Sequence, residues 1–329
     1  MVREEARKVI VTRTKIIRYM RDFLHDRDYL EVETPVLSHH LGGATARPFT
    51  TQHNELDSRL YLRVAPELFL KQLVIGGFDR VFEIGKQFRN EGVDWNHNPE
   101  FTSCELYEAW SDYNDLMVLT QQLLEGLVQQ LELEPRHQGT LLDCSRLERV
   151  EFLPALEGAL GCDLAPPEEL GGEDSRRQLE SLCRREGLPA EGRAPKLLDR
   201  LTGKLVEPGL VQPTLLLHHP AIMSPLAKPH RSVPGLAERF ELFLAGQEVC
   251  NAYTELNDPA VQRVALASQA DLSDPEAMVP DEAYCRALEY GLPPTAGWGC
   301  GVDRLTAILT NCSHIRDTIT FPLVAGNTV

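Results

Sequence analysis

The spacing of apolar and polar residues predicts a long helix at the start of the chain. Between residues 3 and 28, apolar side chains such as Met20, Phe23 and Leu24 recur every three or four positions, as on one face of an amphipathic helix. Alternation typical of a strand follows in YLEVETPVLS and stops at Pro35.

Further elements follow from the same pattern. The run SRLYLRVAPELFLKQLVIGG predicts a strand, a turn at Pro66 and a helix that ends at Gly76–Gly77. RVFEIGKQFRNEG and EFTSCELYEAW alternate like two strands around the polar loop VDWNHNP. Residues 112–132 are expected to form an amphipathic helix that starts at Asp112, and residues 259–290 are also expected to be helical.

The alternation returns in the last third of the chain. PTLLLHHP predicts a strand, and RFELFLAGQEVCNAYTEL predicts two strands joined by a tight turn at Ala245–Gly246. TAGWGCGVDRLTAILTN predicts a glycine-rich strand that continues into a helix. A glycine-containing loop is expected earlier, at residues 39–46.

The order of these elements indicates an α+β fold with an antiparallel sheet flanked by helices, rather than repeated βαβ units. A stretch rich in Glu, Arg, Gly and Pro interrupts it at residues 134–210 and is expected to be a small helical insertion. The core of the fold would then consist of residues 1–133 and 211–329.

Composition indicates an ordinary globular protein that does not enter a membrane. Hydrophobic residues make up 43% and charged residues 25% of 329 residues, and no apolar run approaches the length of a membrane span. The eight cysteines include no CxxC pair, which favours reduced thiols in a cytoplasmic setting. The net charge of −16 argues against a surface that binds nucleic acid all over.

The first candidate site lies on the two strands around the loop VDWNHNP. Because alternate residues of a strand share a face, Arg89 and Glu91 lie together, and so do Phe101, Ser103, Glu105 and Tyr107. His97, in the loop, is placed over this groove. The alternative is that this is a solvated sheet face and that Arg89–Glu91 is a surface pair.

The second candidate site lies on the hairpin around Ala245–Gly246. Asn251, Tyr253 and Glu255 share one face, and Glu241 and Glu248 are close enough to hold a divalent cation. Strict alternation, however, places Glu248 opposite Asn251, so a bulge near residues 249–250 is required. Otherwise the two acids are merely solvated.

The third candidate site is GWGCGVDR. Gly297, Gly299 and Gly301 alternate, which removes side chains from one strand face and lets a flat ligand lie on the backbone; Arg304 stands near the start of the next helix. The motif lacks the context of a dinucleotide-binding loop. Two arginines and several carboxylates without an obvious nucleophile suit phosphoryl or nucleotidyl transfer.

FRNEGVDWNHNPEFTSCELYEAW, EVCNAYTELNDP and GLPPTAGWGCGVDRL closely resemble class II aminoacyl-tRNA synthetases of the lysine type, in particular the eukaryotic-like enzymes. With the first helix and the strand ending at Pro35 as the first motif, the chain resembles all three signature motifs of that class in order. The resemblance covers nearly the whole chain. It implies an antiparallel core that works as a homodimer through the first helix and the strand ending at Pro35. It also implies a ligase that activates L-lysine with ATP and Mg²⁺ and charges the acceptor end of tRNA(Lys) for protein biosynthesis.

The resemblance also implies a role for each candidate residue. Arg89 and Arg304 are the expected catalytic residues, with Arg89 on the α-phosphate and the lysine carboxylate. The remaining assignments are ATP binding for Glu91, His97, Phe101, Gly301 and Arg304; metal and ATP binding for Glu241 and Glu248; and lysine binding for Gly43, Glu67, Arg89, Glu105, Tyr107, Asn251, Tyr253 and Glu255.

Elementary chemistry agrees with a lysine substrate. Buried carboxylates would stay uncompensated without a cationic ligand, so such a pocket rejects neutral isosteres. We expect Glu67 and Glu255 to face the ε-ammonium. The lysine carboxylate is already ionised at neutral pH and needs no general base to attack the α-phosphorus.

Two alternatives stay open. The first dozen residues already enter the catalytic helix, which leaves no room for the anticodon-reading OB-fold usual in lysyl enzymes; we therefore expect a catalytic fragment or an enzyme without anticodon readout. An OB-less paralogue lysylates elongation factor P, but it places a side chain where this chain has Gly299. A non-catalytic synthetase-like protein is the other alternative, and Arg89 and Arg304 argue against it.

Overall fold

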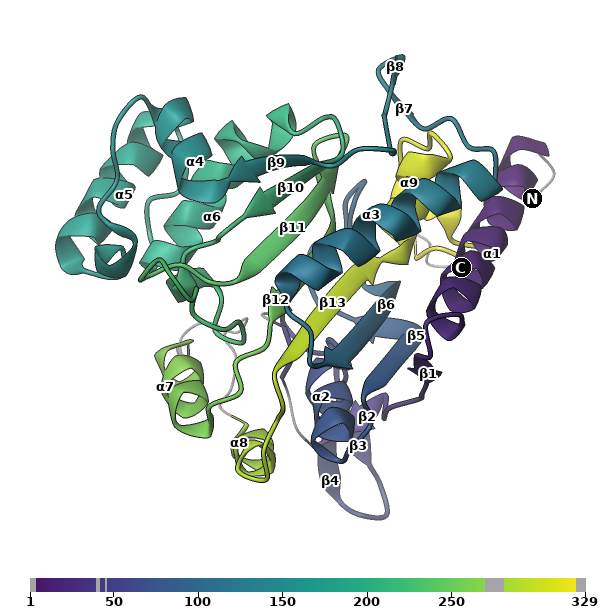
Figure 1. Ribbon diagram of the computed structural model, residues 1–329, viewed down its shortest axis with the longest axis horizontal. Coiled ribbons are helices and arrows are strands. Elements are labelled where there is room, and N and C mark those ends of the chain that lie inside the picture. Colours follow the sequence, from purple (N-terminus) through teal and green to yellow (C-terminus); the bar gives the residue numbers. More distant parts are fainter. Residues whose placement is uncertain (1–3, 40–41, 45, 270–280, 324–329) are drawn as a thin grey trace.

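A large mixed sheet forms the centre of the computed structural model (Figure 1), which describes residues 4–39, 42–44, 46–269 and 281–323. The eight strands lie in the order β1-β5-β6-β13-β12-β11-β10-β9. In that order, their bounds are Leu30–Glu31, Arg80–Phe88, Glu100–Ala109, Thr295–Gly301, Gln247–Thr254, Arg239–Leu244, Thr214–Leu217 and Glu148–Glu151. The inner strands pair antiparallel, which confirms the predicted α+β class, whereas β1 with β5 and β9 with β10 pair parallel at the two edges.

Smaller strands and the helices surround this sheet. The minor strands are β2 (Leu37–Ser38), β3 (Thr50–His53) and β4 (Ser58–Leu62) in one sheet, and β7 (Arg136–His137) with β8 (Thr140–Leu141) in another. The helices are α1 (Glu4–His25), α2 (Glu67–Ile75), α3 (Tyr113–Gln130), α4 (Phe152–Leu160), α5 (Glu173–Arg185), α6 (Ala194–Leu205), α7 (Pro259–Gln269), α8 (Glu282–Leu288) and α9 (Val302–Leu309).

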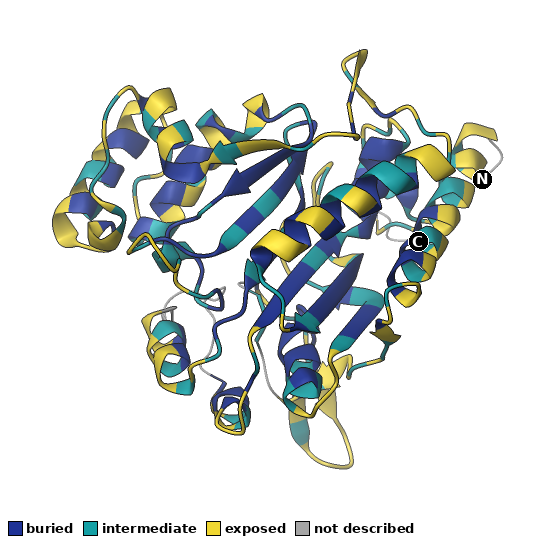
Figure 2. Ribbon diagram, in the orientation of Figure 1, coloured by how far each residue is buried: buried dark blue, intermediate teal, exposed yellow. Residues whose placement is uncertain are grey.

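Helices α1, α3 and α9 cover one face of the sheet and form the main core with it. Met20 of α1, Leu116 of α3 and Leu305 of α9 are buried against inward-facing strand residues such as Leu106 and Trp298. Figure 2 shows the buried strands beneath the exposed outer stripe of α3. Because strand residues alternate between faces, the neighbours of these core residues point to the opposite face, where the candidate site lies.

Two further clusters pack at the ends of the sheet. Helices α4, α5 and α6 bury leucines against Leu216 and Phe243 on the outer strands, and α2 and α8 pack against the other end of β5 and β6. The predicted insertion at 134–210 contains α4 to α6, but β9 from the same stretch joins the main sheet. That residues 134–210 form a separate unit inserted into the core stays a prediction.

Most predicted elements are confirmed. The helix starting at Asp112, the helix ending at Gly76–Gly77 and the turn at Ala245–Gly246 lie where the sequence places them. The strand predicted in YLEVETPVLS is instead two short strands, β1 and β2. Parts of the loop at 39–46 and of the helical stretch at 259–290 lie outside the described residues.

None of the helices within the described ranges is long and apolar enough to cross a lipid bilayer.

Candidate active site

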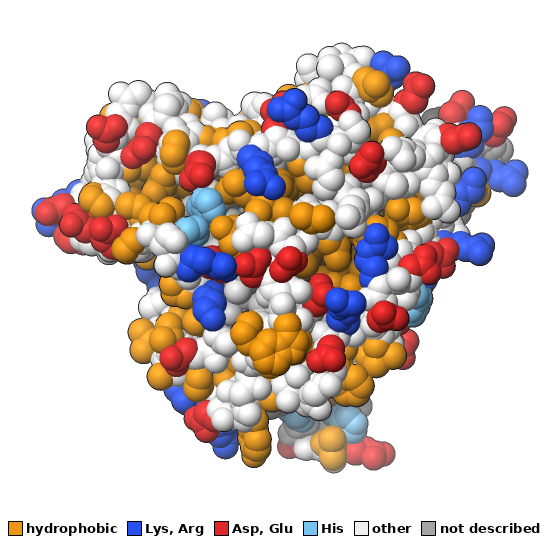
Figure 3. All heavy atoms as spheres, viewed as in Figure 1, with side chains coloured by type: hydrophobic (Ala, Val, Ile, Leu, Met, Phe, Trp, Pro, Cys, Tyr) orange, Lys and Arg blue, Asp and Glu red, His pale blue; other side chains and the backbone are white. Residues whose placement is uncertain are grey.

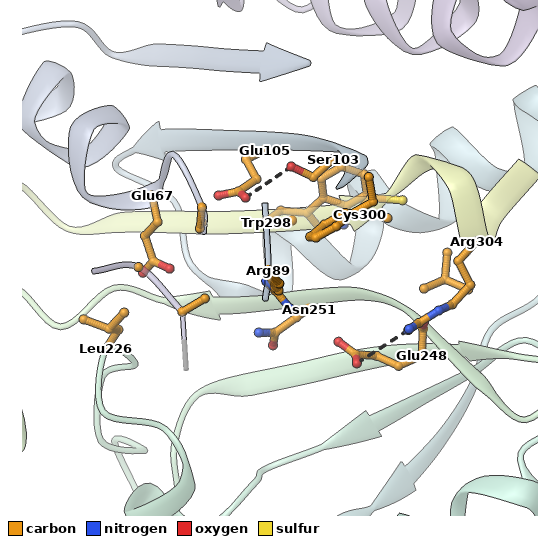
Figure 4. A pocket seen from close by; sticks show the side chains of 18 of the residues that line it. Glu67, Arg89, Ser103, Glu105, Leu226, Glu248, Asn251, Trp298, Cys300 and Arg304 are labelled. Atoms are coloured by element: carbon orange, nitrogen blue, oxygen red, sulfur yellow. Dashed lines mark hydrogen bonds and ion pairs between the residues drawn. The ribbon is translucent and has the colours of Figure 1, made fainter. Parts of the chain in front are cut away.

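A cavity of about 450 Å³ opens on the sheet face that α1, α3 and α9 leave free. Strands β6, β12 and β13, the start of α2 and the loop after β5 contribute its walls. In Figure 4, Glu67 lies at one end and Glu248 with Arg304 at the other, while Arg89 and Asn251 lie between them. The charged side chains at one end are therefore carboxylates, whereas the other end holds charges of both signs.

The strand register explains why distant residues meet here. Gly299 on β13 pairs directly with Glu105 on β6 and with Asn251 on β12. One step along, Gly297 in the same way lies between Tyr107 and Tyr253. The glycines leave bare backbone as the cavity floor, as the alternating pattern predicted, and the flanking side chains rise on both sides of it.

A bulge in β12 brings Glu248 to the same face as Asn251. Leu242 pairs with Cys250 but Phe243 pairs with Glu248, so Val249 has no opposite residue. Two residues of one strand opposite one of the next reset the alternation. The bulge required by the sequence is thus present, and both Glu248 and Asn251 line the cavity.

The acidic end is built around Glu67, in the first turn of α2. Tyr253 donates a hydrogen bond from its hydroxyl to Oε1 of Glu67 at 2.7 Å. Gly43 has a positive φ and approaches so closely that a Cβ there would lie 3.1 Å from the Glu67 Cβ. A Cβ on Gly297 would overlap Glu255 Oε1, so the carboxylate of Glu255 fits beside the floor only because Gly297 has no side chain.

Burial sets the protonation of this end. It raises the pKa of Glu105 to about 8, with a further contribution from the negative charge of Glu67. Burial and the charge of Glu67 likewise raise the pKa of Glu255, although the ammonium of Lys71 opposes them. A cation that enters the cavity would stabilise the ionised form of these buried carboxylates.

Two guanidinium groups line the rest of the cavity, that of Arg89 between the two ends and that of Arg304 at the end opposite Glu67. Arg89 lies with its Cζ 5.0 Å from the centroid of the Phe101 ring, and its Nε is buried without a hydrogen-bond partner among the described residues. Arg304 donates from Nε to Asn96 Oδ1 at 3.1 Å and reaches the backbone carbonyl of Glu248. Such donors suit an anionic ligand beside a planar ring.

Comparison with known proteins identifies the family. The family described as tRNA synthetases class II (D, K and N) matches residues 1–325. The chain belongs to this family.

Individual relatives carry lysine-specific names. The chain is 50% identical to a probable cytoplasmic lysine–tRNA ligase of Encephalitozoon cuniculi, over 98% of this chain and 66% of that protein. It is 46% identical to a lysine–tRNA ligase of Cladosporium cladosporioides (98% and 57%) and 45% identical to one of Dichelobacter nodosus (98% and 65%). The chain thus spans about two thirds or less of the length of these relatives.

The synthetase fold brings most of the predicted residues to the cavity wall. Those lining it are Gly43, Glu67, Arg89, Glu91, His97, Phe101, Glu105, Tyr107, Glu248, Asn251, Tyr253, Gly301 and Arg304. Glu91 and His97 lie at its exposed mouth, where Nδ1 of His97 lies 2.9 Å from the Asp94 carboxylate. Their proposed contacts with a ligand stay predictions.

Glu241 and Glu255 are not among the side chains that line the cavity. Glu241 pairs with Arg239 at 2.5 Å and with His219 at 3.1 Å. Burial opposes ionisation of Glu241, yet His219 and Arg239 outweigh it and lower its pKa. Burial raises the pKa of Glu248, and the negative charge of the Glu241 carboxylate raises it further.

Two residues of the site escaped the sequence reasoning. Arg239 lines the cavity and donates to Asn251 Oδ1 at 3.0 Å; its signal was the two-residue spacing from Glu241 on a predicted strand. Lys71 lies behind the cavity and contacts Glu67; its signal was the four-residue spacing from Glu67 on a predicted helix.

Proposed function

We propose that this chain carries the catalytic machinery of a lysine–tRNA ligase, which activates L-lysine with ATP and transfers the lysyl group to tRNA(Lys). The observation that carries the proposal is a cavity with buried carboxylates at one end, the guanidinium group of Arg89 in the middle and that of Arg304 at the other end. The relatives named as lysine–tRNA ligases support the same substrate.

The acidic end suits the two ammonium groups of lysine. Glu67 and Glu255 are the proposed partners of the ε-ammonium, and Glu105 is available for the α-ammonium. Tyr107 and Asn251 flank the Gly297–Gly299 floor and would orient the amino acid through hydrogen bonds. A neutral isostere would leave these carboxylates unpaired in a dry cavity, so it should bind poorly.

The other end suits ATP. Phe101 and Arg304 are proposed to enclose the adenine ring over Gly301, with Glu91 and His97 at the mouth. Arg89 lies between the two ends, where it can hold both the lysine carboxylate and the α-phosphate. Its partnerless Nε supports this role, because a buried donor of that kind needs an acceptor.

Glu241 and Glu248 are the proposed ligands of Mg²⁺. They are hard oxygen donors, and the effect of Glu241 on the pKa of Glu248 indicates that the two charges repel each other. A dication fits such a pair because it relieves this repulsion. When bound, Mg²⁺ would supply positive charge to the phosphates of ATP.

The proposed reaction is an in-line displacement. The lysine carboxylate attacks the α-phosphorus of ATP, the bond to the bridging oxygen breaks, and pyrophosphate leaves. Arg89 stabilises the charge that develops on the α-phosphate, without a general base. In the second step a hydroxyl of the terminal ribose of the tRNA attacks the lysyl carbonyl carbon. An ester forms, the bond between the carbonyl carbon and the phosphate oxygen breaks, AMP leaves and the hydroxyl proton is released.

We also propose a cytoplasmic homodimer formed through the start of the chain. The name of the Encephalitozoon cuniculi relative includes the cytoplasm. Val11, Leu30, Val36 and Leu37 are large apolar side chains left exposed near the N-terminus, and a partner subunit would cover them.

Lysine-dependent exchange between ATP and pyrophosphate tests the adenylation step. Arg89→Ala should lower the exchange rate at least about 100-fold, because a transition-state partner of the α-phosphate is lost. Arg177→Ala, which removes an exposed arginine of α5, should leave the rate unchanged. Normal exchange by a folded Arg89→Ala variant would refute the assignment.

The acceptor is tested separately. Labelled lysine and ATP are supplied with tRNA, with an acceptor-stem minihelix or with elongation factor P. Label on RNA supports the proposal, and label on the protein factor alone would overturn its second step.

A further inference from the structure

Lys71 of α2 is a lysine that is completely shielded from solvent. A charged side chain in such a place is uncommon unless other groups pair with it, because its transfer from water is costly. It lies behind the cavity rather than in its wall, so it does not itself line the substrate site. The proposed mechanism has given it no role.

The surroundings of the Lys71 ammonium are two carboxylates and two phenol rings. Nζ lies 2.7 Å from Glu67 Oε1 and forms a close ion pair with Glu255 Oε2. It also lies 5.8 Å from the centroid of the Tyr253 ring and 5.6 Å from that of Tyr284. Burial lowers the pKa of Lys71, but Glu255 and Glu67 outweigh it and hold the pKa well above its usual value, so the group stays charged.

Lys71 occupies one oxygen of each carboxylate and leaves the other for a ligand. Oε1 of Glu255 is buried, has no hydrogen-bond partner among the described residues and faces the cavity-lining Gly297. The ammonium of Lys71 thus bridges the two carboxylates, and Oε1 of Glu255 remains as an unpaired acceptor beside the cavity-lining Gly297.

The charges of this end can be counted. When ionised, Glu67, Glu105 and Glu255 carry three negative charges, and Lys71 supplies one positive charge. Two negative charges are left over. Lysine brings two ammonium groups, while its carboxylate has Arg89 as a partner, so the count matches this substrate.

We propose that Lys71 is a positioning residue for substrate selection: a resident ammonium that orients Glu67 and Glu255 and fixes the uncompensated charge of the pocket at two. The inference rests on the proposed function and deepens it. Without Lys71, three carboxylates would face two ammonium groups, and one of them would take up a proton or repel the others.

A double-mutant cycle on the whole chain tests this idea through the KM for lysine in the ATP–pyrophosphate exchange. Lys71→Met keeps the apolar stem and removes the charge, and we expect the KM for lysine to rise at least about tenfold, with the KM for ATP within about twofold of wild type. Lys204→Met, at an exposed site on α6, is the matched control and should change neither value.

The decisive comparison adds Glu255→Gln. This substitution should raise the KM for lysine in the wild-type background but lower it in the Lys71→Met background, because there it returns the pocket to two negative charges. If Lys71→Met does not fold, the double variant is compared with Glu255→Gln alone, and the double variant should have the lower KM.

Other results would overturn the inference. If Lys71 merely fills space, Lys71→Met will match wild type and Glu255→Gln will raise the KM in both backgrounds. If the wild type catalyses lysine-dependent exchange but the variants give either of these outcomes, the role of Lys71 is overturned and the proposed function is not. Absence of lysine-dependent exchange in the wild type overturns the proposed function, and this inference with it.

Discussion

Glu105 shows how a single carboxylate depends on its place in the sheet. It is buried at the centre of β6, opposite the bare backbone of Gly299, and Tyr107 donates to it from 3.4 Å. Burial and Glu67 raise its pKa to about 8, so without a ligand it holds a proton at neutral pH. The protein must therefore be more stable where this group can remain protonated.

The sign of the resulting pH dependence follows from proton binding. Between about pH 5 and 8 the folded chain keeps a proton on Glu105 that the unfolded chain has released, so the free energy of unfolding should fall as pH rises. One such proton contributes up to about 1.4 kcal/mol per pH unit. Denaturant titrations without ligand should show a shallower fall for Glu105→Gln.

Glu100→Gln provides the control for this measurement. It makes the same change at an exposed position of the same strand and should keep the wild-type slope. Equal slopes for Glu105→Gln and wild type would contradict the raised pKa.

For single residues, the sequence predicted which face of a strand a side chain lies on better than it predicted which side chains it contacts. A period of two was sufficient to place Glu105 with Tyr107 on one strand face and Asn251 with Tyr253 on another, because strand geometry alone determines their direction. The contacts of Lys71 with Glu255 and of Glu241 with His219 join different elements, so no local pattern could reveal them.

Among the elements, α3 owes its start to a short polar signal. The Asp112 side chain accepts from the backbone of Asn114, and Asp115 accepts from the backbone N–H of Asp112 at 2.9 Å. This reciprocal cap satisfies donors that the first turn would otherwise leave unpaired. Because α3 covers the core face of β12 and β13, its stability affects the whole sheet.

Asp112→Ala should accordingly lower the free energy of unfolding by about 1 kcal/mol, through loss of the cap and of the ion pair with Arg231. Chemical denaturation measures the change. Glu55→Ala, at an exposed site outside the helices, should remain within about 0.5 kcal/mol of wild type. A similar loss in both variants would argue against the capping role.

The shortened strand β1 shows where element prediction fails. YLEVETP alternates well, but the backbone N–H of Thr34 donates to the Glu83 carboxylate at 3.1 Å instead of continuing a ladder. Arg63 holds that carboxylate at 2.6 Å and also donates to the carbonyl of Thr34. A buried side-chain network thus ends the strand, and alternation contains no information about it.

On the surface of the molecule, large apolar side chains are exposed near the N-terminus. Leu30 and Leu37 are 47% and 49% exposed at the start of the main and minor sheets. Elsewhere, on the face seen in Figure 3, acidic and basic side chains are interspersed. Since exposed leucines gain free energy from burial, they support the proposed contact between two copies of the chain.

Leu30→Glu should therefore shift the proposed dimer towards monomer, because a carboxylate would be buried without a partner. Sedimentation velocity at several concentrations measures this shift. Leu141→Glu, a leucine 50% exposed on β8, is the matched control and should sediment like wild type. A wild-type chain that is monomeric at all concentrations would refute the dimer.

The unpaired Val249 also has a bearing on how the chain can change in length during evolution. A hairpin that lost Val249 would regain a regular two-residue period, yet Glu248 and Asn251 would still point the same way. A one-residue deletion at a regularly paired position of β12 would move the side chains on one side of the deletion to the opposite face of the sheet. Val249 is thus a place where natural variants of this strand could drop one amino acid and still display the same side chains.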